Sequence, residues 1–152
     1  MAGDHVQWSK CEYTTQEKIE GRYLHSALEY KGSVVLFGGC TMFNKKRMQR
    51  ECINQVLVFN PNKKTLGIVK SSGISVSPRR SHSAAIFSKA PVWHRLGKFM
   101  VVYGGYLENG SITDELLSFN LDNLSWSRIY VQRPIEGFAQ ATAVSIAAKP
   151  GN

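Results

Sequence analysis

Short hydrophobic runs that begin after a turn and end in a double glycine occur twice along the chain. Residues 31–39 have the sequence KGSVVLFGG, and residues 97–105 have the sequence GKFMVVYGG. Runs this short, rich in β-branched and aromatic residues and bounded by turn residues, predict buried β-strands, because a helix needs more residues and fewer glycines. Two copies within matching flanks indicate an internal repeat, which decides the fold before single elements do.

The segments on either side of these runs repeat in the same order. Upstream of each run stands an Arg-x-x-His-Ser segment, and downstream stand a strand ending in Phe-Asn and a further short strand. The matching segments are 22–26 with 79–83, 55–60 with 115–120, and 65–70 with 125–130. The offset between copies varies by a few residues, which indicates loops of different length between equivalent strands. Each unit therefore predicts four short strands.

This order of elements resembles the kelch repeat. The resemblance implies an all-β fold, a kelch-like β-propeller segment with two complete four-stranded blades plus flanking single strands. The first unit departs from the pattern, since Leu66 or Gly67 stands where a kelch strand usually carries Trp, as Trp126 does in the second unit. A third unit begins at residues 137–141, where Gln140 stands in the place of the histidine and the arginine is missing.

The repeat boundaries divide the chain into four parts. Residues 1–21 are expected to form the last strand of a preceding blade, at Val6–Cys11, and a connector. Residues 22–77 form the first kelch blade and residues 78–133 the second, while 134–152 start a degenerate third blade and a tail. Propellers close with about 4–8 blades. We therefore expect a segment of a longer kelch protein, with completion by another chain as the alternative.

The composition favours one folded unit. The chain has 152 residues, a hydrophobic fraction of 43% and a formal net charge of +8. No apolar run reaches the roughly 18 residues of a membrane span, so no membrane association is expected. Without a visible secretory signal, Cys11, Cys40 and Cys52 are expected to be reduced thiols in the cytoplasm, with the nucleus as the alternative. Cys40 and Cys52 bracket one loop and could pair in an oxidising setting.

Several repeated residues are expected to serve the blades and not a ligand. His25 and His82 hold equivalent places, 57 positions apart (82 − 25 = 57), and we expect their imidazoles to hydrogen bond to a neighbouring backbone, near Ser26 and Ser83. The double glycines are expected where a bending strand end leaves no room for a Cβ atom. Trp126 is expected in the core. The glycines concerned are Gly38, Gly39, Gly104 and Gly105.

The candidate partner-binding residues are basic. The loop between Cys40 and Cys52 carries Lys45, Lys46, Arg47 and Arg50. This loop is a candidate docking surface for an acidic segment of a protein partner. A merely solvated loop and a nucleic-acid or nuclear-import signal are the alternatives. Arg22 and Arg79 join the candidates, because some kelch modules use arginines near the mouth of the central channel to hold acidic peptides.

No catalytic or cofactor-binding motif is present, so we expect no enzyme and no cofactor. Kelch-like propellers include metal enzymes such as galactose oxidase and the iron-dependent specifier proteins of plants, but their metal ligands cannot be placed on this sequence. The resemblance therefore implies a non-catalytic protein–protein interaction module, part of a larger adaptor or scaffold. A basic nucleic-acid-binding module is the alternative, and a kelch-fold metal enzyme is the third.

Overall fold

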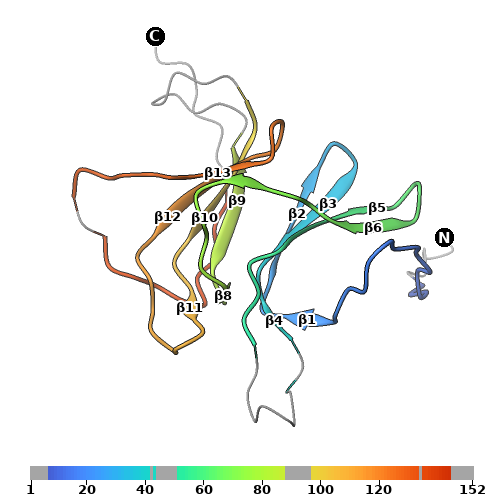
Figure 1. Cartoon of the computed structure of the whole chain (residues 1–152), viewed down its shortest axis with the longest axis horizontal. Coiled ribbons are helices and arrows are strands. Elements are labelled where there is room, and N and C mark those ends of the chain that lie inside the picture. Colours follow the sequence, from blue (N-terminus) through green and yellow to red (C-terminus); the bar gives the residue numbers. More distant parts are fainter. Residues whose placement is uncertain (1–6, 42, 44–50, 88–96, 134, 145–152) are drawn as a thin grey trace, which may run out of the picture.

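The first repeat folds into a four-stranded antiparallel sheet (Figure 1). The computed structural model describes residues 7–41, 43, 51–87, 97–133 and 135–144. The strands of this sheet are β2 (Ser26–Tyr30), β3 (Ser33–Phe37), β5 (Val56–Asn60) and β6 (Thr65–Ile68). Each strand pairs with the next along the chain, in the order β2-β3-β5-β6. The register places Leu66 opposite Phe59 as Trp126 is placed opposite Phe119, so Leu66 and not Gly67 holds the tryptophan position.

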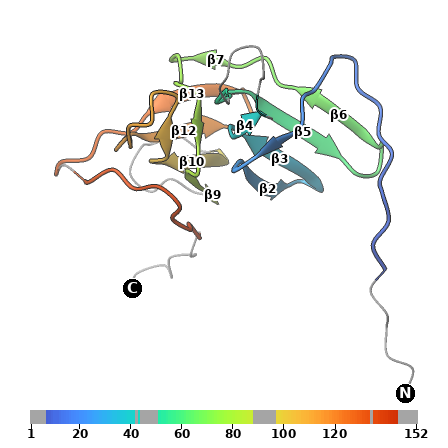
Figure 2. The same ribbon diagram turned by 90° about the horizontal axis from the view of Figure 1, so that it is seen from below.

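The second repeat folds in the same way and adds one short strand. Its strands are β9 (Ser83–Phe87), β10 (Phe99–Tyr103), β12 (Leu116–Asn120) and β13 (Ser125–Arg128), with β7 (Ser72–Gly73) from the connector paired in parallel with β13. Figure 2 shows the two sheets beside each other. The prediction of an all-β fold with two complete four-stranded units is confirmed.

Two small ribbons complete the described strands. They are β1 (Arg22–Tyr23) with β4 (Cys40–Thr41), and β8 (Arg79–Arg80) with β11 (Tyr106–Leu107). Both lie at the lower end of the sheets in Figure 1. They form because each double glycine turns the chain out of the second strand of its sheet towards the segment that enters the first.

Asparagine side chains hold the tight turns at the opposite end of the sheets. The Asn60 side chain accepts a hydrogen bond from the Lys63 backbone at 2.9 Å, and Asn120 accepts one from Asp122 at 2.8 Å. Such Asn side chains replace backbone partners in tight turns. Asp122 also links the two sheets, because the Tyr30 hydroxyl donates to its carboxylate at 2.9 Å.

The hydrophobic core lies between the two sheets. Trp126 is 3% exposed and packs against Phe37 of the first sheet and Phe119 of its own, each at a ring-centroid distance of 4.8 Å. Phe37 and Met100 are fully buried beside them. Each such side chain contributes about 1.5–3 kcal/mol on leaving water. Trp126 therefore packs one blade against the next, beyond filling its own sheet.

The N-terminal segment differs from the expectation. Residues 7–13 form no strand, and Trp8 is 96% exposed. A fourth strand is held by the third strand of its own blade, and no described strand lies beside this segment. Thr14 instead makes a parallel bridge to Thr65, the same contact that β7 makes with β13. This segment thus enters the first blade as the later connector enters the second.

The third unit docks without a strand in residues 135–144. The Phe138 carbonyl accepts from Gly105 N at 2.7 Å, as the Arg79 carbonyl accepts from Gly39 N at 2.9 Å. The Gln140 backbone donates to Ser81 at 2.8 Å, as Ser81 donates to Leu24 at 2.9 Å. Gln140 is therefore equivalent to Ser81, so the expected alignment was wrong by one residue. Ala141 holds the histidine place.

Candidate partner-binding rim

The loop-bearing end of the two sheets is the candidate binding surface. We call it the ribbon rim and define it as β1, β4, β8, β11, Leu24 directly after β1, and the loops that leave β4 and β11 (Figure 1). Leu24 and Ile112, exposed by 45% and 48%, present apolar surface there. Scaffold strands that position variable loops are a common arrangement for recognition.

The basic residues of the predicted docking loop lie outside the described residues. These are Lys45, Lys46, Arg47 and Arg50. The stem of their loop is described: Thr41 N donates to the Glu51 carbonyl at 3.0 Å, and Ile53 N donates to the Gly39 carbonyl at 2.9 Å. The stem places both ends of the basic loop on the ribbon rim.

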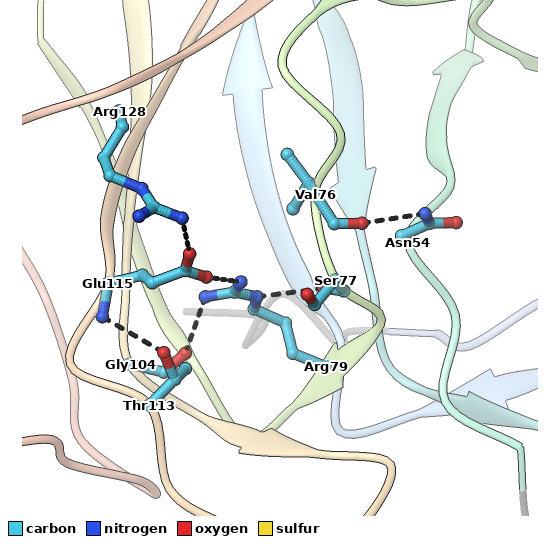
Figure 3. A network of polar contacts seen from close by, with 8 residues as sticks. All are labelled: Asn54, Val76, Ser77, Arg79, Gly104, Thr113, Glu115 and Arg128. Atoms are coloured by element: carbon cyan, nitrogen blue, oxygen red, sulfur yellow. Dashed lines mark hydrogen bonds and ion pairs between the residues drawn. The ribbon is translucent and has the colours of Figure 1, made fainter.

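Arg79 is buried and fully engaged. It has no exposed surface, and its Nε donates to the Ser77 carbonyl at 3.2 Å while Nη1 donates to the Gly104 carbonyl at 3.3 Å (Figure 3). Its Nη2 forms an ion pair with Glu115, which also pairs with Arg128. A guanidinium with these partners is a structural cross-link between the connector and the second blade. Arg79 offers no surface to a partner.

Arg22 holds the equivalent place in the first blade, with different neighbours. Its Nη2 donates to the Gln55 side chain at 2.9 Å, and Gln55 stands where the second blade has Glu115. Its Nε and Nη1 are buried without a hydrogen-bond partner. Burial lowers the pKa of Arg22, and the charge of Glu20 acts in the opposite direction. Arg22 is half-buried, and the side chain paired with it is a neutral amide where Arg79 has a carboxylate.

The two histidines differ because only one has a blade before it in the described structure. His82 Nε2 and Ser26 Oγ are hydrogen bonded at 2.9 Å, so the partner is a hydroxyl and not the expected backbone group. The His82 ring also meets Phe37 edge-on at 5.0 Å. In the third unit Ala141 has no ring, and its carbonyl accepts from Ser83 Oγ at 2.8 Å instead. His25 Nδ1 is buried without a partner.

The stability of the fold is expected to fall in mild acid because of His82. Burial lowers the pKa of His82 to about 4, and the positive charge of Arg79 acts in the same direction. An unfolded histidine has a pKa of about 6.5. The unfolded chain therefore binds the proton first, and stability decreases between about pH 6.5 and pH 4, by up to about 3 kcal/mol.

Denaturant unfolding at pH 7 and pH 4.5, in the natural chain and in His82→Gln, measures this effect. The natural chain should lose more stability than the variant, in which the lowered pKa values of His25 and Asp122 still act in the same direction. Equal losses in the two chains would show that His82 is not the responsible group.

A left-handed backbone conformation recurs directly before each histidine place, and no residue type in the sequence marks it. Leu24, Ser81 and Gln140 have positive φ angles of 57°, 54° and 60°. This left-handed conformation is uncommon for residues other than glycine, and Leu is a poor candidate for it. Their backbones form a hydrogen-bonded series from one unit to the next. Only the regular spacing from the neighbouring histidine place could have marked these positions.

The described residues offer neither a metal site nor a membrane-spanning helix. Within them, no group of three or more His, Cys, Asp and Glu side chains is placed to hold a metal ion. The same residues contain no helix of the length and apolarity that crossing a bilayer requires.

The repeated sheets agree with the comparison to protein families. A family model described as the KLHDC2/KLHL20/DRC7 Kelch-repeats domain matches residues 3–149. The chain belongs to the kelch-repeat family. Kelch repeats are generally protein-interaction modules.

The chain matches only part of the length of each relative. Kelch-like protein 15 of Mus musculus and that of Rattus norvegicus are each 26% identical to this kelch chain over 118 residues, which cover 78% of the chain and 18% of the relative. A solved structure titled "Structure of YjhT" superposes with a TM-score of 0.58 at 16% identity, over 78% of this chain and 40% of that one. This likeness shows the fold. The kelch chain spans about a fifth of the length of the curated relatives it matches.

Proposed function

We propose that this kelch chain is a non-catalytic recognition module that binds an acidic segment of a partner protein at the ribbon rim. The observation that carries the proposal is the contrast between Arg22 and Arg79. Arg79 is saturated by a carboxylate and two carbonyls, whereas two Arg22 nitrogens lack an acceptor. Both nitrogens are buried in the structure, so binding requires the half-buried Arg22 side chain to turn towards the rim, where an acceptor would satisfy donors that are now unpaired.

A carboxylate is the acceptor that suits Arg22 best. Gln55 offers it one neutral oxygen, whereas a carboxylate offers two charged oxygens in the geometry of the guanidinium fork. The net charge of +8 and the four cations of the loop attached at β4 attract such a segment from a distance. Leu24 and Ile112 supply exposed apolar surface on the same rim for neighbouring side chains of the partner.

Loss of the Arg22 charge is expected to weaken binding about tenfold or more, the contribution of a charge-assisted hydrogen bond. The probe is a fluorescently labelled peptide pool rich in Asp and Glu, titrated with the natural chain and with Arg22→Gln. Arg133→Gln is the matched control, because Arg133 is exposed and belongs to none of the rim strands. Equal affinities of the natural chain and Arg22→Gln would refute the assignment of Arg22.

Reversal of Lys45, Lys46 and Arg47 to Glu tests the loop separately. We expect loss of peptide binding, and an unchanged melting transition is the control which shows that the variant still folds. A random-sequence DNA duplex is the second probe. Tight binding of the duplex with a steep salt dependence, and none of the peptides, would favour the nucleic-acid-binding alternative.

A further inference from the structure

Two buried thiols face each other at the stem of the basic loop. Cys40 Sγ and Cys52 Sγ are 3.5 Å apart, and the two residues form an isolated antiparallel bridge. The hydrogen bonds around the bridge run from Thr41 N to the Glu51 carbonyl and from Ile53 N to the Gly39 carbonyl. These bonds flank the cysteine pair and do not join it, so Cys40 and Cys52 are a non-hydrogen-bonded pair, the class in which side chains are closest.

This arrangement suits a disulfide. Facing residues of a non-hydrogen-bonded pair have Cα atoms about 4.5 Å apart, within the roughly 4.4–6.8 Å range that a disulfide spans. The sulfur atoms need only approach from contact distance to a bond of about 2 Å, by rotation of the two side chains. No movement of the flanking backbone is required.

The two cysteines have unequal surroundings. Arg80 Nη1 donates to Cys52 Sγ at 3.4 Å, and the Arg80 guanidinium is held over the Tyr106 ring at 5.2 Å. This contact places a positive charge directly against the Cys52 sulfur. Cys52 is also the more accessible of the pair, 8% exposed against 1% for Cys40. Burial and the bond to Cys52 raise the pKa of Cys40 to about 11, which keeps it a thiol.

We propose that Cys40 and Cys52 are an oxidative modification site at which hydrogen peroxide forms a reversible disulfide across the stem of the basic loop. The Cys52 thiolate attacks one peroxide oxygen, the O–O bond breaks, and hydroxide leaves to take up a proton as water. The Cys40 sulfur then attacks the Cys52 sulfenic acid. The S–S bond forms, the S–O bond breaks, and the hydroxyl leaves with the Cys40 proton as a second water.

The disulfide changes the surface on which the proposed function rests. It joins both ends of the loop that carries Lys45, Lys46, Arg47 and Arg50 into a closed covalent ring. A closed ring has fewer conformations than an open loop. Oxidation would therefore change the affinity of the ribbon rim for an acidic partner, by restricting the conformations of the basic loop.

The chemistry is tested without any partner, so its failure is distinct from failure of the proposed function. Cys11 is exposed and is first changed to Ser to remove a competing thiol. The folded Cys11→Ser chain is treated with hydrogen peroxide, quenched with catalase, denatured and alkylated with a maleimide. Intact mass should show both thiols protected, with full recovery of alkylation after dithiothreitol. Tryptic peptides containing Cys40 and Cys52 should be joined, since trypsin cuts at Lys45 and Arg47 between them.

Two variants sharpen the test. Arg80→Gln should slow disulfide formation several-fold, while Arg133→Gln should leave the rate unchanged. A Cys11→Ser, Cys40→Ser chain should give no joined peptide and no mass loss of two hydrogens, and its Cys52 should instead gain oxygen as a sulfenic acid or a higher oxide. Complete alkylation of Cys40 and Cys52 in the peroxide-treated Cys11→Ser chain, or protection without a joined peptide, would overturn the proposal.

Discussion

Gly38→Ala is expected to lower the free energy of unfolding by about 3 kcal/mol or more, because the added methyl group has no space between the two blades. A Cβ atom at Gly38 would lie 2.8 Å from the Arg79 carbonyl oxygen and 2.9 Å from the His82 ring. Overpacking of a rigid site costs about 1–3 kcal/mol, and the positive φ of 67° adds about 1–2 kcal/mol. Denaturant unfolding of the natural and variant chains measures the loss.

Gly32→Ala separates the two contributions. Gly32 has a similar φ of 72°, but a Cβ atom there would meet nothing within 4 Å. This variant should lose only the backbone term of about 1–2 kcal/mol. If Gly38→Ala and Gly32→Ala destabilise the chain equally, the double glycine serves the turn alone and the contact between blades tolerates the methyl group.

The fold could be predicted from the sequence because its signal is periodic. Each blade is a set of short apolar strands separated by glycine and asparagine turns, and the second copy confirms the interpretation of the first. The exact docking of units could not be predicted in this way. Whether Gln140 or Ala141 takes the histidine place depends on the backbone bonds to Ser81 and Gly105, which follow from packing and not from composition.

The candidate site was predictable only in part. The sequence marks Arg22 and Arg79 as equivalent, and the repeat does place them equivalently. Their chemistry differs because the first blade has Gln55 where the second has Glu115. Each of these residues lies more than 30 positions along the chain from the arginine that it contacts. Aligning the two Phe-Asn strands reveals this exchange, but only the structure shows that these side chains meet the arginines.

Glu115→Gln is expected to lower the free energy of unfolding by about 2–3 kcal/mol, because it leaves the charge of Arg79 buried without a counter-charge. Removing one partner of a fully buried ion pair costs about 3–5 kcal/mol. The loss here is smaller, because the Glu115 side chain is 20% exposed and water screens part of the charge. Arg128 also loses its partner, but its side chain is 45% exposed and can be hydrated.

The reciprocal exchange, Gln55→Glu, is the matched control, and denaturant unfolding at pH 7 compares the variants. It gives Arg22 the carboxylate that Arg79 has, so stability should stay the same or rise by up to about 1 kcal/mol. The same variant should weaken the binding of acidic peptides, because an internal carboxylate then competes for the Arg22 guanidinium. A Gln55→Glu chain as destabilised as Glu115→Gln would contradict the equivalence of the two sites. An undiminished peptide affinity would place the binding site away from Arg22.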